Sequence, residues 1–239
     1  MAILNSIIGI LFIFAVSYLL SNNKKHIKWR TIIIGFLIQF GFALIVLKWS
    51  VGRYVLSKAS LGVQGVISYA NEGIGFVFGS LTNDGSIFAV NVLCVIIFIS
   101  AVVSILYYLG IMQFIIRVIG GALSKLLGTS QLETISASAN IFLGQTEAPL
   151  LIKPYVAKLT ESELFTVMVG GLASVSGSIL VGYSLLGIPI EYLISASFMA
   201  APAGLIISKM LYPETEFDKI QNEVKMVKDD SANVVDAAS

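Results

Sequence analysis

Charged residues are scarce in this chain of 239 residues: Asp, Glu, Lys and Arg together make up 12% of it, whereas 56% is hydrophobic. Soluble domains carry about 25% charged residues, so this chain has too few of them to cover a surface that faces water. The composition therefore predicts an all-α polytopic membrane protein rather than a soluble domain.

Cysteine and histidine are each present only once, as Cys94 and His26. One cysteine can form neither an internal disulfide nor a thiolate metal cluster, and Cys94 is most simply a small apolar residue of a membrane helix. His26 stands among lysines, where a solvated loop residue is the simplest interpretation. The net charge of +1 provides no basic face for nucleic acid, which is not expected as a partner.

Long uncharged runs predict the membrane spans, because about 20 apolar residues in a helix cross the bilayer core. The runs lie at about residues 3–20, 31–47, 87–109, 164–188 and 192–208. The first run lacks the pattern of a cleaved signal peptide and is read as a retained span. Lysines, His26 and Arg30 crowd the segment Asn22–Arg30, which the positive-inside rule places in the cytoplasm; the N-terminus is then outside.

Three other segments are helical or polar without being spans. Residues 53–81 show helical spacing diluted by polar residues, which predicts a helix in the outer interface of the membrane. Residues 111–127, after a break at Gly110, predict an amphipathic helix near the inner surface. Residues 213–239 are polar and charged, as expected of a cytoplasmic segment.

The segment 131–158 has the length of a span but a polar middle, GQTEAPL. A continuous helix would bring Glu147 near the bilayer centre, at a cost of roughly 2.5–3.5 kcal/mol. A re-entrant helical hairpin avoids this cost if its tip, Gly144–Glu147, faces a cavity. Thr146 is expected to cap the second half-helix, and Pro149 suits its first turn.

Broken helices of this kind are typical of secondary transporters, in which half-helix ends bind ions and substrate. Asn140 lies one helical turn before the tip, where its amide oxygen and the Leu143 carbonyl suit a cation. The run GGLASVSGS, residues 170–178, is either the opposite wall of the site or a packing seam of small residues.

Three segments, SASANIFLGQTEAPLLIKPY, ELFTVMVGGLASVSGS and EYLISASFMAAPAGL, closely resemble the concentrative nucleoside transporter family, in particular its Na⁺-coupled branch. The motif GQTEAPL with an asparagine one turn upstream is highly specific. The resemblance begins in the region Asn83–Val90 and runs to the C-terminus, whereas the first two spans match only in type.

The resemblance implies a homotrimer in the plasma membrane, the inner membrane of a bacterium, with a scaffold domain and a mobile transport domain in each subunit. Residues 1–109 would be the scaffold-type region and 110–212 the transport-type region. Nucleosides would be imported with Na⁺ in an elevator-like motion, with Na⁺ as the coupling ion and no other cofactor. The implied nucleobase ligands are Gln145, Thr146 and Glu147; the implied Na⁺ ligands are Asn140, Leu143 (carbonyl), Ser174 (hydroxyl) and Val175 (carbonyl).

Family members are longer, and a second, inverted repeat in them supplies the residues that bind the ribose. The present sequence stops at ANVVDAAS, which resembles the start of the cytoplasmic helix before that repeat. The chain is therefore expected to be the N-terminal half of a transporter, whether a fragment, a truncated product or one piece of a split one. Its missing partner would be the C-terminal half.

Four alternatives remain beside this interpretation. In the first, Glu147 serves structure alone, paired with Lys153 or a backbone group. A channel is expected to line its pore with a repeated ring, not with one asymmetric tip. A membrane-embedded enzyme needs a nucleophile–base pair or a metal cluster, whereas the aspartates here lie in loops and the tail. The last alternative is a fragment that does not transport.

Overall fold

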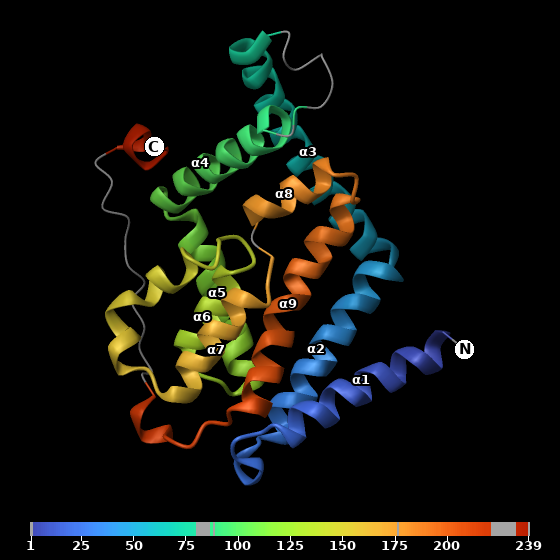
Figure 1. Ribbon diagram of the computed structural model, residues 1–239, viewed down its shortest axis with the longest axis vertical. Coiled ribbons are helices and arrows are strands. Elements are labelled where there is room, and N and C mark those ends of the chain that lie inside the picture. Colours follow the sequence, from blue (N-terminus) through green and yellow to red (C-terminus); the bar gives the residue numbers. More distant parts are fainter. Residues whose placement is uncertain (1, 80–86, 88, 176, 221–232, 239) are drawn as a thin grey trace.

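The computed structural model describes residues 2–79, 87, 89–175, 177–220 and 233–238, and every regular element within them is helical (Figure 1). The α-helices are α1 (Ala2–Leu19), α2 (Trp29–Leu47), α3 (Ser50–Phe78), α4 (Cys94–Tyr108), α5 (Ile111–Leu127), α6 (Gln131–Ala139), α7 (Glu161–Leu172), α8 (Gly177–Leu185), α9 (Ile190–Leu211) and α10 (Val234–Ala238). Between them lie the 3₁₀ helices Lys24–His26, η4 (Ala148–Lys158) and Phe217–Lys219, and the π-helix Ala89–Leu93. The predicted all-α fold is confirmed.

Within the described residues, three helices are long and apolar enough to cross a membrane: Trp29–Val46, Ala89–Tyr108 and Ile190–Leu211. They correspond to the predicted spans 31–47, 87–109 and 192–208, although residue 88 lies outside the described part of the chain. The predicted span 3–20 is helical in α1, but its apolar stretch, Leu4–Leu19, is shorter than the other three.

The predicted span 164–188 is interrupted, and its crossing of the membrane stays a prediction. Two helices, α7 and α8, occupy this range, and Ala173, Ser174 and Val175 between them are not helical. The reason is a tertiary contact: the Gly177 N–H donates to the Phe142 carbonyl at 3.2 Å. The chain between α6 and η4 thus lies against the start of α8, where an uninterrupted helix would have no N–H to offer.

The two predicted surface helices are both present. The helix expected within residues 53–81 is α3, which ends at Phe78; residues 80 and 81 lie outside the described residues. Large apolar side chains on α3 are exposed, Phe76 by 92%, so lipid or another protein has to cover them. The helix expected at 111–127 is α5, which starts after Gly110 (φ +81°), the predicted break. Its buried residues follow one face: Met112, Ile116, Gly120, Leu123 and Leu127.

The predicted hairpin 131–158 consists of α6, an irregular turn and η4. Pro149 lies in the first turn of η4, as predicted. The prediction that Thr146 caps this helix is wrong, because Glu147 precedes η4 and no side chain caps it. The backbone closes the turn instead: the N–H groups of Glu147 and Ala148 both donate to the Gly144 carbonyl, at 3.1 and 3.0 Å.

Helix α9 connects the hairpin to the N-terminal helices. It packs against α2, α7, α8 and α6, and Figure 1 shows it (orange) between α2 and the pair α6 and α7. Leu205, fully buried, joins α9 to a cluster with Leu127 of α5 and Ile141 of the turn. The division into regions 1–109 and 110–212 stays a prediction, since α2 contacts α9 and α4 contacts α8 across it.

Candidate substrate and cation site

The three residues predicted to bind substrate lie side by side in the turn of the hairpin. Gln145, Thr146 and Glu147 are all exposed on this chain. The Glu147 carboxylate accepts a hydrogen bond from the Gly144 N–H at 3.1 Å, and a pair with Lys153 is not among the ion pairs of the described residues. A carboxylate offers about four lone-pair sites, so Glu147 can accept further hydrogen bonds from a ligand.

Small residues of α7 let the turn come close to that helix. A Cβ added to Gly171 would lie 3.3 Å from Gln145 Cβ, and one added to Gly170 would lie 3.3 Å from Asn140 Nδ2. The glycine run was predicted to be either a packing seam or a wall of the site. Gly170 and Gly171 pack against the turn of the hairpin. This close packing brings α7 beside both Asn140 and Gln145.

Asn140 combines nearly complete burial with unmet hydrogen-bonding capacity. Asn140 lies at the C-terminal end of α6 and is 1% exposed. Neither atom of its side-chain amide has a hydrogen-bond partner in the part of the chain that the structure describes. A buried polar group left without a partner costs about 1–3 kcal/mol. The C-terminal end of a helix also carries partial negative charge. An amide oxygen in this place fits the ligation of a cation.

One of the other predicted cation ligands, Ser174, is linked to Asn140 through Gly170, which contacts both. Ser174, in the break between α7 and α8, donates its hydroxyl proton to the Gly170 carbonyl at 2.6 Å. The lone pairs of the Ser174 oxygen remain available, as a metal ligand requires. Leu143 lies in the same turn as the substrate residues, with its side chain buried in the core of the hairpin. The predicted ligands of substrate and cation thus come from one turn and one helix break that pack together.

Ser197 of α9 also belongs to this arrangement, and sequence reasoning missed it. Its hydroxyl lies 3.0 Å from the Ile141 carbonyl and 3.1 Å from the Val175 carbonyl, and the residue is buried. It therefore ties the turn after α6 to the break after α7. A serine in a membrane helix usually bonds a carbonyl of its own helix, so nothing in the sequence marked Ser197.

Helix breaks that meet inside an apolar, all-helical chain are typical of membrane transporters. Comparisons with known proteins agree. Family models match in succession as Na⁺ dependent nucleoside transporter N-terminus (residues 8–81), Nucleoside recognition (89–189) and Na⁺ dependent nucleoside transporter C-terminus (192–239). The chain belongs to the concentrative nucleoside transporter family, which confirms the resemblance carried by GQTEAPL.

Relatives match over nearly the whole chain. An uncharacterized transporter, YutK of Bacillus subtilis, is 54% identical over 100% of this chain and 60% of its own length. The nucleoside permease NupC of Helicobacter pylori is 46% identical over 93% of this chain and 55% of its own length. A solved structure, CNTnw in an inward-facing substrate-bound state, superposes with a TM-score of 0.93 at 48% identity, covering 100% of this chain and 58% of that one. The chain thus spans little more than half the length of these proteins.

Proposed function

We propose that this chain forms the N-terminal part of a symporter that imports nucleosides together with Na⁺. One observation carries the proposal: Asn140, a buried amide without a hydrogen-bond partner among the described residues, lies in the same short turn as the exposed polar residues Gln145, Thr146 and Glu147. Two ligands that bind one small element can each bias its conformation, and that bias is reciprocal. Such a turn is a physical basis for coupling substrate to cation.

The cation would bind between the turn and the helix break. Asn140 and the Leu143 carbonyl come from one side, Ser174 and the Val175 carbonyl from the other. Neutral oxygens at helix breaks suit Na⁺. Binding would draw the two sides together and hold the turn in one conformation, because each side supplies only part of the coordination.

The nucleobase would then meet a turn that is already ordered. Gln145 offers both a donor and an acceptor, Thr146 a hydroxyl, and Glu147 acceptor oxygens. A nucleobase edge carries donors and acceptors in a fixed pattern, which such a set can match. The C-terminal half, as expected from the sequence, would supply the contacts to the ribose.

The remaining parts of the proposal concern assembly and placement. We place the complete protein in the plasma membrane as a homotrimer, with the N-terminus outside and residues 22–30 in the cytoplasm. The exposed apolar side chains of α3 support contacts of this helix with lipid or a second subunit. The relatives are named permease and transporter, which favours transport over a membrane-embedded enzyme.

The proposal is tested by joining residues 1–239 to the C-terminal part of the Helicobacter pylori permease and measuring labelled uridine uptake in cells without nucleoside uptake of their own. The intact permease is the positive control. Uptake that saturates with uridine and requires Na⁺ is expected. Uptake that rises linearly with uridine indicates a channel, and a well-inserted chimera without uptake contradicts the proposal.

A further inference from the structure

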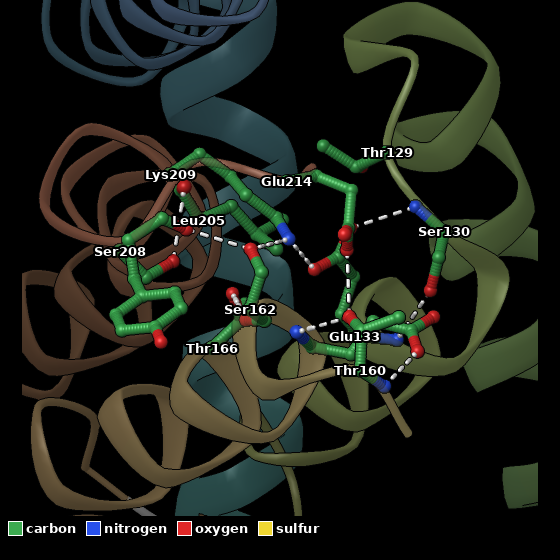
Figure 2. A network of polar contacts seen from close by, with 12 residues as sticks. Thr129, Ser130, Glu133, Thr160, Ser162, Thr166, Leu205, Ser208, Lys209 and Glu214 are labelled. Carbon is green, nitrogen blue, oxygen red and sulfur yellow. Dashed lines mark hydrogen bonds and ion pairs between the residues drawn. The ribbon is translucent and has the colours of Figure 1, made fainter. Parts of the chain in front are cut away.

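A cluster of buried charge lies at the starts of α6 and α7, the opposite end of the hairpin from its turn. Figure 2 shows its polar contacts. Lys209, in the last turn of α9, places its Nζ 2.6 Å from Glu133 Oε2 of α6 and 2.8 Å from Ser162 Oγ of α7. These three residues are 8%, 1% and 2% exposed, respectively. One buried ammonium group therefore connects three helices.

Helices α6 and α7 begin with the same device, a capping box. At α6, the Ser130 N–H donates to Glu133 Oε1 at 2.7 Å, and Ser130 Oγ accepts from the Glu133 N–H at 3.4 Å. At α7, Thr160 and Glu163 make the equivalent bonds at 2.9 and 3.1 Å. Only Glu133 also pairs with Lys209. Glu133 therefore caps α6 and, through Lys209, links α6 to α9 and α7. The role of Glu163 is to cap α7.

The charges of the cluster make Lys209 hard to replace. Glu133, Glu163 and Glu214 are buried, and Glu214 accepts a hydrogen bond from Thr160 Oγ1 at 2.7 Å. Lys209 is the cation that the described ion pairs place among them, and the N-terminal ends of α6 and α7 add partial positive charge. Removing one member of a buried ion pair leaves an uncompensated buried charge, which is strongly destabilising. Separating Lys209 from Glu133 is therefore costly, and the pair holds its geometry firmly.

The far ends of these two short helices carry the candidate cation ligands. Glu133 and Asn140 are separated on α6 by about 10 Å, at a rise of 1.5 Å per residue. On α7, Ser162 lies near the start, and Ser174 follows the end. Gly170 keeps the two helices in close contact: a Cβ there would lie 4.0 Å from Ala137 Cα and 3.3 Å from Asn140 Nδ2. Closely packed helices transmit a shift at one end to the other.

We propose that Lys209 is a positioning residue: the bridge Glu133–Lys209–Ser162 sets the axial register of α6 against α7, and thereby the spacing of Asn140 and Ser174 around the cation. The consequence for the cation rests on the proposed function. The register itself does not, and can be measured in the absence of transport.

A disulfide across the hairpin measures the register directly. In a Cys94→Ser background, Gln145→Cys and Gly171→Cys bring together two positions whose Cβ atoms would lie 3.3 Å apart, close to the spacing of about 3.5–4.5 Å found in disulfides. Oxidation should cross-link this protein rapidly. Adding Lys209→Met should slow cross-linking, and Lys209→Arg, which keeps the cation, should restore it. Glu163→Gln, which changes the equally buried capping carboxylate of α7, is the matched control and should not slow it.

Ser162→Ala decides the question if Lys209→Met fails to fold, because it keeps the ion pair and removes both links that the Ser162 hydroxyl makes between α7 and the end of α9, the bond from Lys209 and the bond to the Tyr212 carbonyl. Ser208→Ala is its control, since the Ser208 hydroxyl bonds a carbonyl of its own helix, that of Leu205. Ser162→Ala should slow cross-linking, and Ser208→Ala should not. Equal rates in both variants and the parent overturn the proposal.

The effect on the cation is measured in the chimera with the Helicobacter pylori permease. Lys209→Met should raise the Na⁺ concentration for half-maximal uridine uptake on the order of tenfold, and Lys209→Arg should return it towards the parent value. An unchanged Na⁺ dependence in a well-expressed Lys209→Met variant contradicts a positioning role. A parent chimera that takes up uridine without Na⁺ counts against the proposed function instead, and cross-linking then still decides the register.

Discussion

The side chain of Asn140 lies against the backbone of Gly170, so closely that a Cβ on that glycine would come within 3.3 Å of the amide nitrogen. This contact joins the end of α6 to α7 at the level where α7 is about to break. A cation site built here depends on two elements at once, because neither the turn nor the break alone supplies enough oxygens. Substitutions in the turn and in the break therefore separate the contributions of the two elements.

Asn140→Ala and Ser174→Ala should each raise the Na⁺ concentration for half-maximal uridine uptake in the chimera and leave a weak residual uptake. Each removes one neutral oxygen from the proposed coordination. Ser138→Ala is the control, since Ser138 is equally buried on α6 but lies two residues from Asn140, on another face of the helix. Na⁺ titrations of uptake provide the measurement. If Ser138→Ala shifts the titration as much as Asn140→Ala, the oxygen of Asn140 has no special role.

Gly177→Ala should strongly reduce both expression and uptake. A Cβ at this position would lie 2.7 Å from the Phe142 carbonyl oxygen, a backbone atom that cannot swing away. The turn would have to separate from the break. Gly121→Ala in α5 is the control: a Cβ there meets nothing within 4 Å, and replacing an unstrained helical glycine stabilises by about 0.4–1 kcal/mol. Fluorescence-detected gel filtration against temperature compares the two, and equal melting temperatures would contradict the predicted contact.

Glu147→Gln should lose most uridine uptake while membrane insertion and assembly stay intact. Glu147 is exposed on this chain, and a bound substrate would cover it; a polar contact buried in this way that loses its partner forfeits about 1–3 kcal/mol, more for a charged group, which is tenfold or greater in affinity. Glu72→Gln is the control: it changes an exposed glutamate of α3, far from Glu147 in the sequence, and should leave uptake unchanged. Uptake and surface expression are measured on the same cells. Misfolding of Glu147→Gln would support the structural alternative for Glu147, and wild-type uptake would exclude both roles.

Cysteine at Asn22 should be shielded from an impermeant thiol reagent in intact cells, whereas cysteine at Asn71 should react, both in a Cys94→Ser background. The positive-inside rule favours a cytoplasmic position for the basic segment 22–30, and α3 is expected on the outer side. Permeabilised cells, in which both cysteines should react, provide the control. Equal labelling of the two in intact cells would overturn the proposed orientation.

The sequence predicted the hairpin well because its signal is local. Glu147 in an apolar run is costly in a bilayer unless the helix breaks, and Pro149 marks the start of the next one. The break between α7 and α8 was missed because residues 164–188 carry no charge, and the interruption depends on the distant carbonyl of Phe142. Sequence spacing cannot reveal such a contact.

The buried bridge was missed for the same reason. Glu133 and Lys209 are far apart in the sequence, and each resembles an ordinary charge at the end of an apolar run. A local signal was present, since Ser130 with Glu133 and Thr160 with Glu163 both follow the pattern of a capping box. The pattern predicts two helix starts, but not that Lys209 lies between them.

The most direct test of Na⁺-driven nucleoside import is accumulation of uridine in proteoliposomes that contain the chimera. With Na⁺ outside and none inside, uridine should rise inside above its external concentration and fall back when the Na⁺ gradient is collapsed. A pH gradient imposed without Na⁺ should cause no accumulation. Equal uridine concentrations inside and outside under a maintained Na⁺ gradient, or accumulation driven by the pH gradient alone, would contradict the account.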